Sequence, residues 1–299
     1  MRKGKIPSLM CAALLLMLLP FGASAFTCKA AGVVLSGSGT VNVPVTLTPE
    51  IQVSQNLVVN LGNSIQCKND APQFYLDPIR VGVASAFGGA LANFRGSMSY
   101  YGSSYPFPTT TATKYVNHTW GTYQPWNTVL YLTATGAAGG VVIPQGSLIA
   151  SLRLEKGGSD VQVITWNLYA ANSVVVPTGG CDVSSRNVTV NLPDYPATQS
   201  VPLTVRCAAN QQLAYYLTGT TTDTGATIFA NTASSSPAQG IGIQLRNNAG
   251  ILKTNQNVSM GTVGTSSTSL NLVARYERTG PQVVSGNVQS VIGVTFIYQ

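Results

Sequence analysis

Residues 286–299, GNVQSVIGVTFIYQ, carry the pattern that decides the fold of the C-terminal half. Apolar residues recur there at alternate positions, which is the period of a β-strand with one buried face. The residues on that face are Val288, Ile292, Val294, Phe296 and Tyr298. Tyr298 is penultimate, although chain termini usually fray. The pattern fits the last strand of an ordinary sandwich, and it also fits a strand that must pair with a strand from another chain.

Composition places the rest of the chain in the same class. Only 8% of the 299 residues are charged, which excludes coiled coils and long exposed helices. Because 44% of the residues are hydrophobic, extended disorder is excluded as well. Short apolar runs, separated by Gly and Pro clusters, predict strands at 40–47, 55–61, 79–83, 97–101, 129–133, 146–154, 161–170, 187–192, 199–207, 214–220, 241–246, 268–276 and 290–298. This spacing predicts an all-β protein with two β-sandwich domains.

The N-terminus has the features of a secretory signal peptide. Three basic residues precede an apolar run at 10–19, and Ala23-Ser24-Ala25 follows, so cleavage is expected after Ala25. The apolar run is too short to span a membrane. The expected mature chain has 13 basic and 9 acidic residues, a net charge of +4 without a basic run. Nucleic-acid binding therefore has no support.

The cysteines predict one disulfide in each half. Cys11 leaves with the signal peptide, and four cysteines in an exported chain indicate two disulfides. Three pairings are possible, but the clustering favours Cys28–Cys67 and Cys181–Cys207. A Pro/Gly break at 177–180 lies between the two pairs, so we place one domain at 26–177 and the other at 178–299.

Catalytic and metal-binding signals are weak. His118 is the single histidine, and no serine-elbow motif accompanies it, which argues against a catalytic triad and a histidine-based zinc site. Asp77 and Asp160 are a formal candidate for a glycosidase carboxylate pair. The low number of acids fits binding equally well, and we expect neither an enzyme nor a cofactor nor a metal.

Several long motifs resemble one known family, the two-domain tip adhesins of chaperone–usher pili, with the type 1 fimbrial adhesins as the nearest relatives. In the second half they are PTGGCDVS at 177–184, LPDYP at 192–196, SPAQG at 236–240 and GNVQSVIGVTF at 286–296. In the first half they are QNLVV at 55–59, SSYPFPTT at 103–110 and GSLIA at 146–150. The resemblance covers essentially the whole chain after residue 25.

The resemblance implies that the second domain is an incomplete immunoglobulin-like pilin domain that lacks its last strand. A periplasmic chaperone first fills the open groove, and the adjacent pilus subunit then donates its own strand at the outer-membrane usher. The residues expected to pair with these partners are Gly286, Val288, Ile292, Val294, Phe296 and Tyr298. Because cleavage after Ala25 leaves no free N-terminal arm before Cys28, we expect the protein to accept a strand without donating one. That predicts an extracellular position at the pilus tip.

The resemblance also implies that the first domain is a lectin whose shallow pocket holds one sugar of a host glycan. The pocket positions carried over are Phe26 with its α-amine, Asn69, Asp70, Asp77, Lys156 and Asp160. Carboxylates and amides suit sugar hydroxyls, because the former accept and the latter both donate and accept hydrogen bonds. Turn formation by the pairs 69–70 and 77–78 is the structural alternative for these residues.

The chain departs from the mannose-binding relatives at several of these positions. Lys156 replaces a Gln, and it matches the Lys of a galactose-binding relative. The loop after Lys156 is reduced to Gly157, Gly158 and Ser159, without the Asn ligand and gate Tyr of the relatives, and Ala71 replaces the other gate Tyr. The sugar is thus of mannose or galactose type, and the alternative function is a structural tip initiator with a degenerate pocket.

Overall fold

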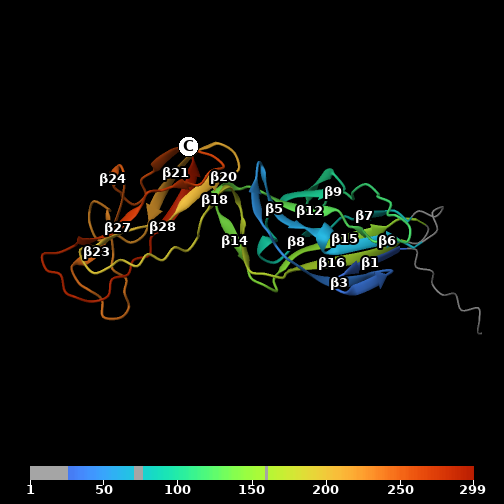
Figure 1. Ribbon diagram of the computed structural model, residues 1–299, viewed down its shortest axis with the longest axis horizontal. Helices are drawn as coiled ribbons and strands as arrows, with labels where there is room; N and C mark the ends of the chain where they lie inside the picture. The colour runs from blue at the N-terminus through green and yellow to red at the C-terminus, as the bar shows by residue number, and fades with distance from the viewer. Residues whose placement is uncertain (1–25, 71–76, 159–160) are drawn as a thin grey trace, which may run out of the picture.

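The structure is a computed structural model that describes residues 26–70, 77–158 and 161–299. Two hydrophobic cores follow one another along the long axis of the molecule (Figure 1). The first core runs from Phe26 to Val176, and the second takes all but one of its buried residues from Cys181 to Phe296. The described residues form strands and short 3-10 helices but no α-helix, which confirms the predicted all-β class.

Strands of the first half build three sheets and a two-stranded ladder around the first core. One sheet has the order β11 (Gln124–Pro125), β6 (Ile65–Asn69), β1 (Phe26–Ala30) and β2 (Val33–Ser36). The second has the order β10 (Ser103–Phe107), β9 (Gly96–Tyr100), β12 (Thr128–Thr133), β5 (Gln55–Asn60) and β4 (Glu50–Gln52). The third has the order β3 (Gly39–Val45), β16 (Gln162–Ala170), β15 (Leu148–Lys156) and β7 (Ile79–Val81), with β8 (Ala86–Phe87) also paired to β15. The ladder joins β14 (Gly140–Ile143) to β17 (Val174–Pro177), and the 3-10 helices are η2 (Leu61–Asn63) and η3 (Gly89–Leu91).

Alternation of apolar and polar residues explains why these strands face the core as they do. In β3, Val41, Val43 and Val45 are buried, whereas the intervening Asn42 and Pro44 are exposed. β3 pairs in parallel with β16, whose Trp166 is fully buried. Burying one face of each strand fixes the register, because a one-residue slip would turn the valines to solvent.

Strands of the second half form three further sheets around the second core. The first has the order β13 (Gly136–Ala138), β18 (Gly179–Val183), β20 (Thr204–Cys207) and β26 (Thr268–Ser269). The next has the order β19 (Thr198–Ser200), β27 (Val273–Arg278), β23 (Ile241–Asn247) and β22 (Ile228–Phe229), with β24 (Gly250–Ile251) also paired to β23. The last has the order β25 (Val258–Val263), β21 (Gln211–Thr218) and β28 (Gly293–Tyr298).

Three predicted strands of the second half differ from the observed ones. Residues 187–192 form no strand, although Val188 and Leu192 pack partly buried against the second core. The run 199–207 divides into β19 and β20, and 268–276 divides into β26 and β27. β19 and β27 pair with each other, whereas β20 and β26 lie in the other sheet, so each run changes sheets midway.

One strand from the first half joins the second core. β13 pairs in parallel with β18, with Gly136 opposite Gly179 and Ala138 opposite Cys181. Ala137 is 5% exposed and belongs to the second core. The two halves of the sequence are therefore linked by a strand as well as by the 177–180 segment, and the boundary at 177/178 stays a prediction.

Both predicted disulfides are present. Cys28 bonds to Cys67, and Cys181 bonds to Cys207. The two cysteines of each pair lie directly opposite one another on neighbouring strands, β1 with β6 and β18 with β20. Among the described residues, no helix is both long and apolar enough to cross a membrane.

Candidate functional site

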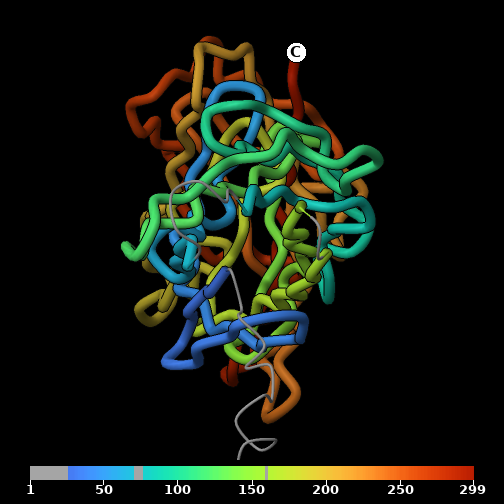
Figure 2. The backbone as a smooth tube through the Cα atoms, turned by 90° about the vertical axis from the view of Figure 1, so that its right-hand side faces the viewer, coloured from blue at the N-terminus to red at the C-terminus, as the bar shows by residue number. Residues whose placement is uncertain are grey.

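The predicted ligand residues of the first half lie at the ends of β1, β6, β7 and β15. In Figure 1 the labels β1, β6 and β7 stand near the end of the molecule that is remote from the second core. Figure 2 looks along the long axis from that end and shows the loops of the first half in front. The candidate site is thus placed on strands at one tip of the molecule.

Phe26 and Asn69 face each other across the first pair of strands. Phe26 begins β1, and Asn69 ends β6, with the two residues in register. Both are 1% exposed. The ring of Phe26 lies edge-on to His118, with ring centroids 5.9 Å apart. This packing fixes the start of β1 and therefore the position of the α-amine that the predicted cleavage would create.

Asp70 directly follows Asn69, and each of its two carboxylate oxygens contacts another side chain. Its Oδ1 atom lies 2.5 Å from Lys68 Nζ, and its Oδ2 atom accepts a hydrogen bond from the Thr27 hydroxyl. The hydrogen bond that the Lys68 ammonium donates to Asp70 raises the pKa of Lys68. These two contacts fix the orientation of the Asp70 carboxylate. It can still accept a further hydrogen bond, because its oxygens have unused lone pairs.

Asp77 and Lys156 form the second cluster. Lys156 ends β15, and its Nζ atom lies 3.3 Å from Asp77 Oδ1. The Lys156 side chain is only 4% exposed and that of Asp77 12%. The other oxygen, Asp77 Oδ2, is buried and has no hydrogen-bond partner among the described residues. A buried acceptor without a donor costs about 1–3 kcal/mol, so it favours a ligand that brings a hydroxyl.

Segment 116–121 joins the two clusters. Val116 exchanges both main-chain hydrogen bonds with Ile79, two residues after Asp77. Farther along, Thr119 O accepts a hydrogen bond from Asn69 N, and Gly121 N donates one to Asn69 O. The strand end that carries Asn69 and the strand start that follows Asp77 are therefore bridged by one stretch of backbone. Asp160, the remaining predicted ligand residue, lies outside the described residues.

The buried side chain of His118 connects segment 116–121 to β6 and to Tyr101. Its Nδ1 atom lies 2.9 Å from Cys67 O and its Nε2 atom 2.6 Å from the Tyr101 hydroxyl. Burial raises the pKa of Tyr101 to about 12, so its hydroxyl keeps a proton to donate to Nε2. Burial lowers the pKa of His118, partly offset by the hydrogen bond to Cys67. The neutral ring with a proton on Nδ1 satisfies both contacts.

Sequence reasoning missed Thr27, Trp120 and the supporting role of His118. Thr27 and His118 act through contacts to residues far away in the chain, for which the sequence carries no signal. Trp120 is 57% exposed beside Asn69, whereas Trp126 and Trp166 are fully buried. Its position in a polar stretch was the one available indication of exposure.

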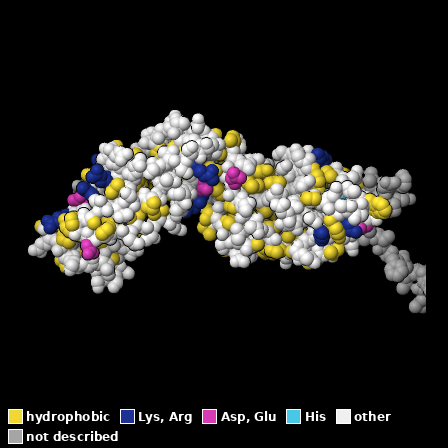
Figure 3. Space-filling view, viewed as in Figure 1, with side chains coloured by type: hydrophobic (Ala, Val, Ile, Leu, Met, Phe, Trp, Pro, Cys, Tyr) yellow, Lys and Arg dark blue, Asp and Glu magenta, His cyan; other side chains and the backbone are white. Residues whose placement is uncertain are grey.

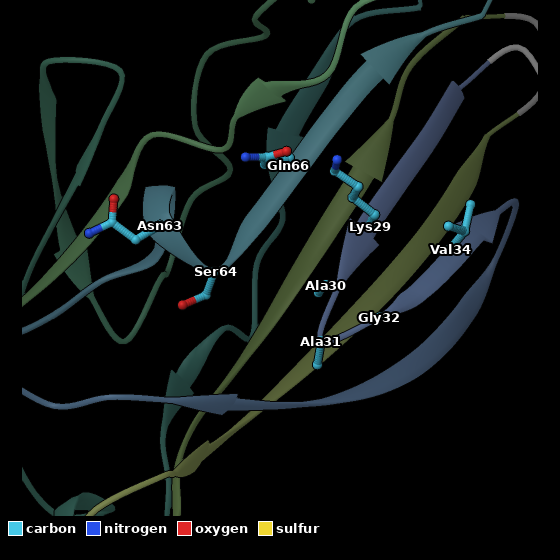
Figure 4. Close-up of a pocket in the computed structure, with 8 residues that line it drawn as sticks. All are labelled: Lys29, Ala30, Ala31, Gly32, Val34, Asn63, Ser64 and Gln66. Atoms are coloured by element: carbon cyan, nitrogen blue, oxygen red, sulfur yellow. The ribbon is translucent and has the colours of Figure 1, made fainter.

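A separate cavity of about 300 Å³ opens at the opposite end of β1. Figure 4 shows Lys29 and Gln66 projecting from the neighbouring strands β1 and β6 near Asn63 and Ser64. The Lys29 Nζ atom lies 4.3 Å from the centre of the Tyr123 ring, which also attracts Lys68. The cavity has no carboxylate and none of the predicted ligand residues, so we do not assign the sugar to it.

Other site chemistry is sparse. Within 26–70, 77–158 and 161–299, no group of three or more His, Cys, Asp or Glu side chains could hold a metal ion. Charged side chains are few on the face shown in Figure 3. The candidate site offers hydrogen-bonding groups and one buried ion pair, Lys156 with Asp77.

The C-terminal residues form β28, which lies at the edge of the sheet with the order β25, β21 and β28. β28 pairs with β21 on one side, from Leu213 opposite Tyr298 to Thr218 opposite Gly293. Phe296 is buried in the second core, and Val288, Ile292 and Val294 pack against it. Gly286 precedes the strand, and Tyr298 is 44% exposed. The predicted alternation is thus present on the core-facing side of this segment.

Comparison with known proteins gives clear sequence matches. Residues 28–167 match the family model described as "FimH, mannose binding". The chain is 54% identical over 292 residues to the "Type 1 fimbrin D-mannose specific adhesin" of Escherichia coli (strain K12), covering 96% of this chain and 97% of that protein. It is 36% identical over 277 residues to the "S-fimbrial protein subunit SfaH" of Escherichia coli O6:K15:H31 (strain 536 / UPEC), covering 87% of this chain and 92% of that protein.

Solved structures give weaker matches. The CupB6 tip adhesin of Pseudomonas aeruginosa matches over 90% of both chains with 15% identity and a TM-score of 0.28. A chain of the CsuC-CsuE chaperone–tip subunit complex of Acinetobacter baumannii matches over 90% of this chain and 99% of that chain, with 11% identity and a TM-score of 0.26. At these TM-scores the structural matches add nothing to the sequence matches.

Proposed function

Because the chain belongs to the family of the type 1 fimbrial adhesins, we propose that it is a pilus-tip adhesin whose first domain, 26–177, binds the terminal sugar of host glycans. The family consists of adhesins and not of enzymes. One observation carries the binding proposal, namely the buried Asp77 Oδ2 atom, which has no hydrogen-bond partner within the described part of the chain, next to the buried Lys156. A sugar hydroxyl supplies the missing donor.

The pocket would use its charged groups in complementary ways. Asp77 and Asp70 accept hydrogen bonds from sugar hydroxyls, while Lys156 and the α-amine of a mature Phe26 donate them. Hydrogen bonds to charged groups contribute about 1.5–3 kcal/mol each. A monosaccharide site of millimolar to micromolar affinity has about 4–8 kcal/mol in total, so two such bonds account for much of it.

The identity of the sugar depends on Lys156. An ammonium group is a point donor without acceptor capacity, whereas an amide both donates and accepts. We infer that the ligand is a hexose of mannose or galactose type that meets Lys156 with an acceptor oxygen. The 54% identical relative is named as D-mannose specific, so mannosides and galactosides are the first probes.

A glycan array with the full mature chain tests this proposal. We expect binding to glycans that end in mannose or galactose, and loss of that binding in the double variant Asp77→Asn/Lys156→Gln. The double variant removes both charges together, so the fold is not left with a buried lone lysine. A wild-type chain that binds no glycan would support the structural tip initiator instead.

We also propose that the second domain, 178–299, is completed by a strand from another chain. β28 has a strand partner on one side only among the described residues, and 187–192 pairs with no described strand although its side chains pack on the second core. Unpaired edges with apolar side chains between them favour strand addition. The donors would be a periplasmic chaperone and then the adjacent subunit at the outer-membrane usher, after export through the periplasm.

Co-purification tests the strand proposal separately. Removing Tyr298 and Gln299 shortens the edge that a chaperone strand would follow, and it removes the pairing of Tyr298 with Leu213. We expect capture by the chaperone to fall at least tenfold. Substitution of Tyr195, an exposed tyrosine before β19, whose sheet does not include β28, serves as the control. Unchanged capture of the shortened chain would show that β28 is an ordinary last strand.

A further inference from the structure

Two arginines share one glutamate on the solvent-facing side of β7 and β15. Arg80 Nε donates a hydrogen bond to Glu155 Oε2 at 2.9 Å, and Arg153 Nε donates one to Glu155 Oε1 at 3.0 Å. Arg80 lies opposite Glu155 on the neighbouring strand, and Arg153 lies two residues before Glu155 on the same face of β15. One carboxylate therefore serves two cations, and this arginine cluster (Arg80, Arg153 and Glu155) keeps a net charge of +1.

The backbone around the cluster fixes the place of the shared carboxylate. A Cβ at position 82 would overlap with Glu155 Oε1, so Gly82 leaves the room that the carboxylate needs. Gly82 N donates to Arg153 O at 2.7 Å, and Arg153 N donates to Ser85 Oγ at 2.9 Å. The Glu155 side chain is only 12% exposed. The carboxylate is therefore a built part of the strand surface, and it holds both guanidinium groups in place.

Both guanidinium groups keep donors for a further anion. The side chains of Arg80 and Arg153 are 33% and 48% exposed. Each uses only its Nε atom toward Glu155, and among the described residues the terminal nitrogens of both donate no hydrogen bond. A guanidinium presents its N–H groups as a planar fork that fits two oxygens of a carboxylate or a sulfate. The cluster thus offers positioned donors with uncompensated charge.

Tyr115 connects the arginine cluster to the proposed pocket. The Arg80 guanidinium lies 4.7 Å from the centre of the Tyr115 ring. On the other side, a Cβ at position 157 would lie 2.8 Å from Tyr115 Cε1, so the ring rests on the backbone of Gly157. Gly157 directly follows Lys156, the last residue of β15. A single aromatic ring therefore contacts both Arg80 and the backbone that follows Lys156.

The acids of the proposed pocket that the structure describes are paired with other cations. Asp70 contacts Lys68, and Asp77 contacts Lys156. Neither acid forms an ion pair with the arginine cluster. The positive charge of the cluster consequently faces solvent beside a pocket whose described charges balance each other.

We propose that Arg80 and Arg153 bind the anionic group of an acidic glycan whose neutral sugar occupies the proposed pocket. This inference rests on the proposed sugar-binding function. The anionic group is the carboxylate of a sialic or uronic acid or a sulfate ester, because both present oxygens that a guanidinium fork can bind. The ligand class is then a mannose- or galactose-containing chain with an acidic substituent, rather than a neutral chain.

A titration of the full mature chain with matched glycans tests the anion site. Each set contains one neutral mannose- or galactose-containing chain, its sialylated form and its sulfated form. We expect an acidic member to bind about threefold to tenfold more tightly than the neutral one, because charge-assisted hydrogen bonds are stronger than neutral ones. The preference should be smaller at about 300 mM than at about 50 mM NaCl, because salt screens exposed charges. The acidic member that binds more tightly identifies the source of the anion.

Single variants keep the test independent of folding. Arg80→Gln and Arg153→Gln each leave Glu155 with one arginine, and each should remove most of the acidic preference. The Kd of the neutral glycan should stay within about twofold, because a neutral ligand gains little from the second charge. Arg80→Lys should keep only part of the preference, because an ammonium lacks the planar fork. Arg95→Gln is the matched control, since it removes the same charge from an exposed arginine before β9.

The outcomes separate this inference from the proposed function. An acidic preference that survives in both Arg→Gln variants would overturn the anion site, as would a wild type that binds neutral and acidic glycans equally. Sugar binding would stand in either case. An equal loss in the Arg95→Gln control would also overturn the site, because it would show an effect of overall charge. A wild-type chain that binds no member of any set would overturn the proposed function and the anion site with it.

Discussion

Lys156 Nζ lies 3.3 Å from Asp77 Oδ1, and both side chains are largely shielded from solvent. Two opposite charges buried together depend on each other, because either one alone would be left uncompensated. No residue that the structure describes donates a hydrogen bond to the other carboxylate oxygen, Asp77 Oδ2. The proposed pocket thus contains a preformed ion pair and one further acceptor atom, Asp77 Oδ2.

Breaking this ion pair from one side should destabilise the first domain. Asp77→Asn leaves a buried ammonium without its counter-charge, and we expect a loss of about 3–5 kcal/mol in the free energy of unfolding. Adding Lys156→Gln removes the lone charge and should recover most of that loss. Thermal unfolding of the single and double variants checks this coupling. Equal melting temperatures for both would contradict it.

Asn56 should couple the 177–180 segment to the first core. Its Nδ2 atom donates to Pro177 O and Gly179 O, each at 2.9 Å, and the side chain is fully buried. Asn56→Ala leaves two carbonyls without this donor, so we expect a loss of about 1–3 kcal/mol and faster protease cleavage at 177–180.

The matched control for that variant is Asn42→Ala. Asn42 is exposed, and its Oδ1 atom accepts a 3.2 Å hydrogen bond from Asn167. Its removal should change neither stability nor cleavage appreciably. Cleavage rates that match between the two variants would rule out the role assigned to Asn56.

The stability of the protein should fall at mildly acidic pH because of His118. Burial lowers the pKa of this histidine in the folded state, whereas the unfolded chain protonates near pH 6.5. The stability that depends on a neutral His118 is therefore fully present above about pH 6.5. It is lost as the pH falls from there through the folded-state pKa. Since His118 is the single histidine, His118→Gln should flatten the melting temperature between pH 7.5 and pH 5. A variant with the wild-type slope would contradict this assignment.

The two halves should differ when they are produced separately. Fragment 26–177 keeps the whole first core, whereas fragment 178–299 loses Ala137 from the second core and β13 from the edge of β18. We expect 26–177 to be monomeric and 178–299 to aggregate, as size-exclusion chromatography would show. A monomeric 178–299 fragment that melts cooperatively without an added strand would refute this expectation.

Local patterns were sufficient to predict much of the fold. The alternation in β3 and in β28 reports which face is buried, and the pairing of cysteines within each half follows from their clustering. Residues 187–192 mislead, because their side chains alternate against the core without a strand partner among the described residues. A sequence pattern records burial, and it does not record whether the backbone is paired.

The candidate site was less predictable than the fold. Its acids came from a resemblance to relatives, whereas the burial of Lys156 and the bridge from Asn69 to Trp120 depend on contacts between distant segments. The parallel pairing of β13 with β18 was equally hidden, since the sequence predicted no strand at Gly136 to Ala138. Such features require the positions of several strands at once.

The most direct test of the account is the affinity of the full mature chain for its best glycan, measured with the native Phe26 terminus and with one added glycine before Phe26. Phe26 is buried and in register with Asn69, so an extra residue would displace the α-amine and put backbone in the place proposed for the sugar. We predict that the extension weakens binding at least tenfold while the melting temperature stays unchanged. If the extended chain binds as tightly as the native one, the sugar does not lie at Phe26, and the assigned pocket is wrong.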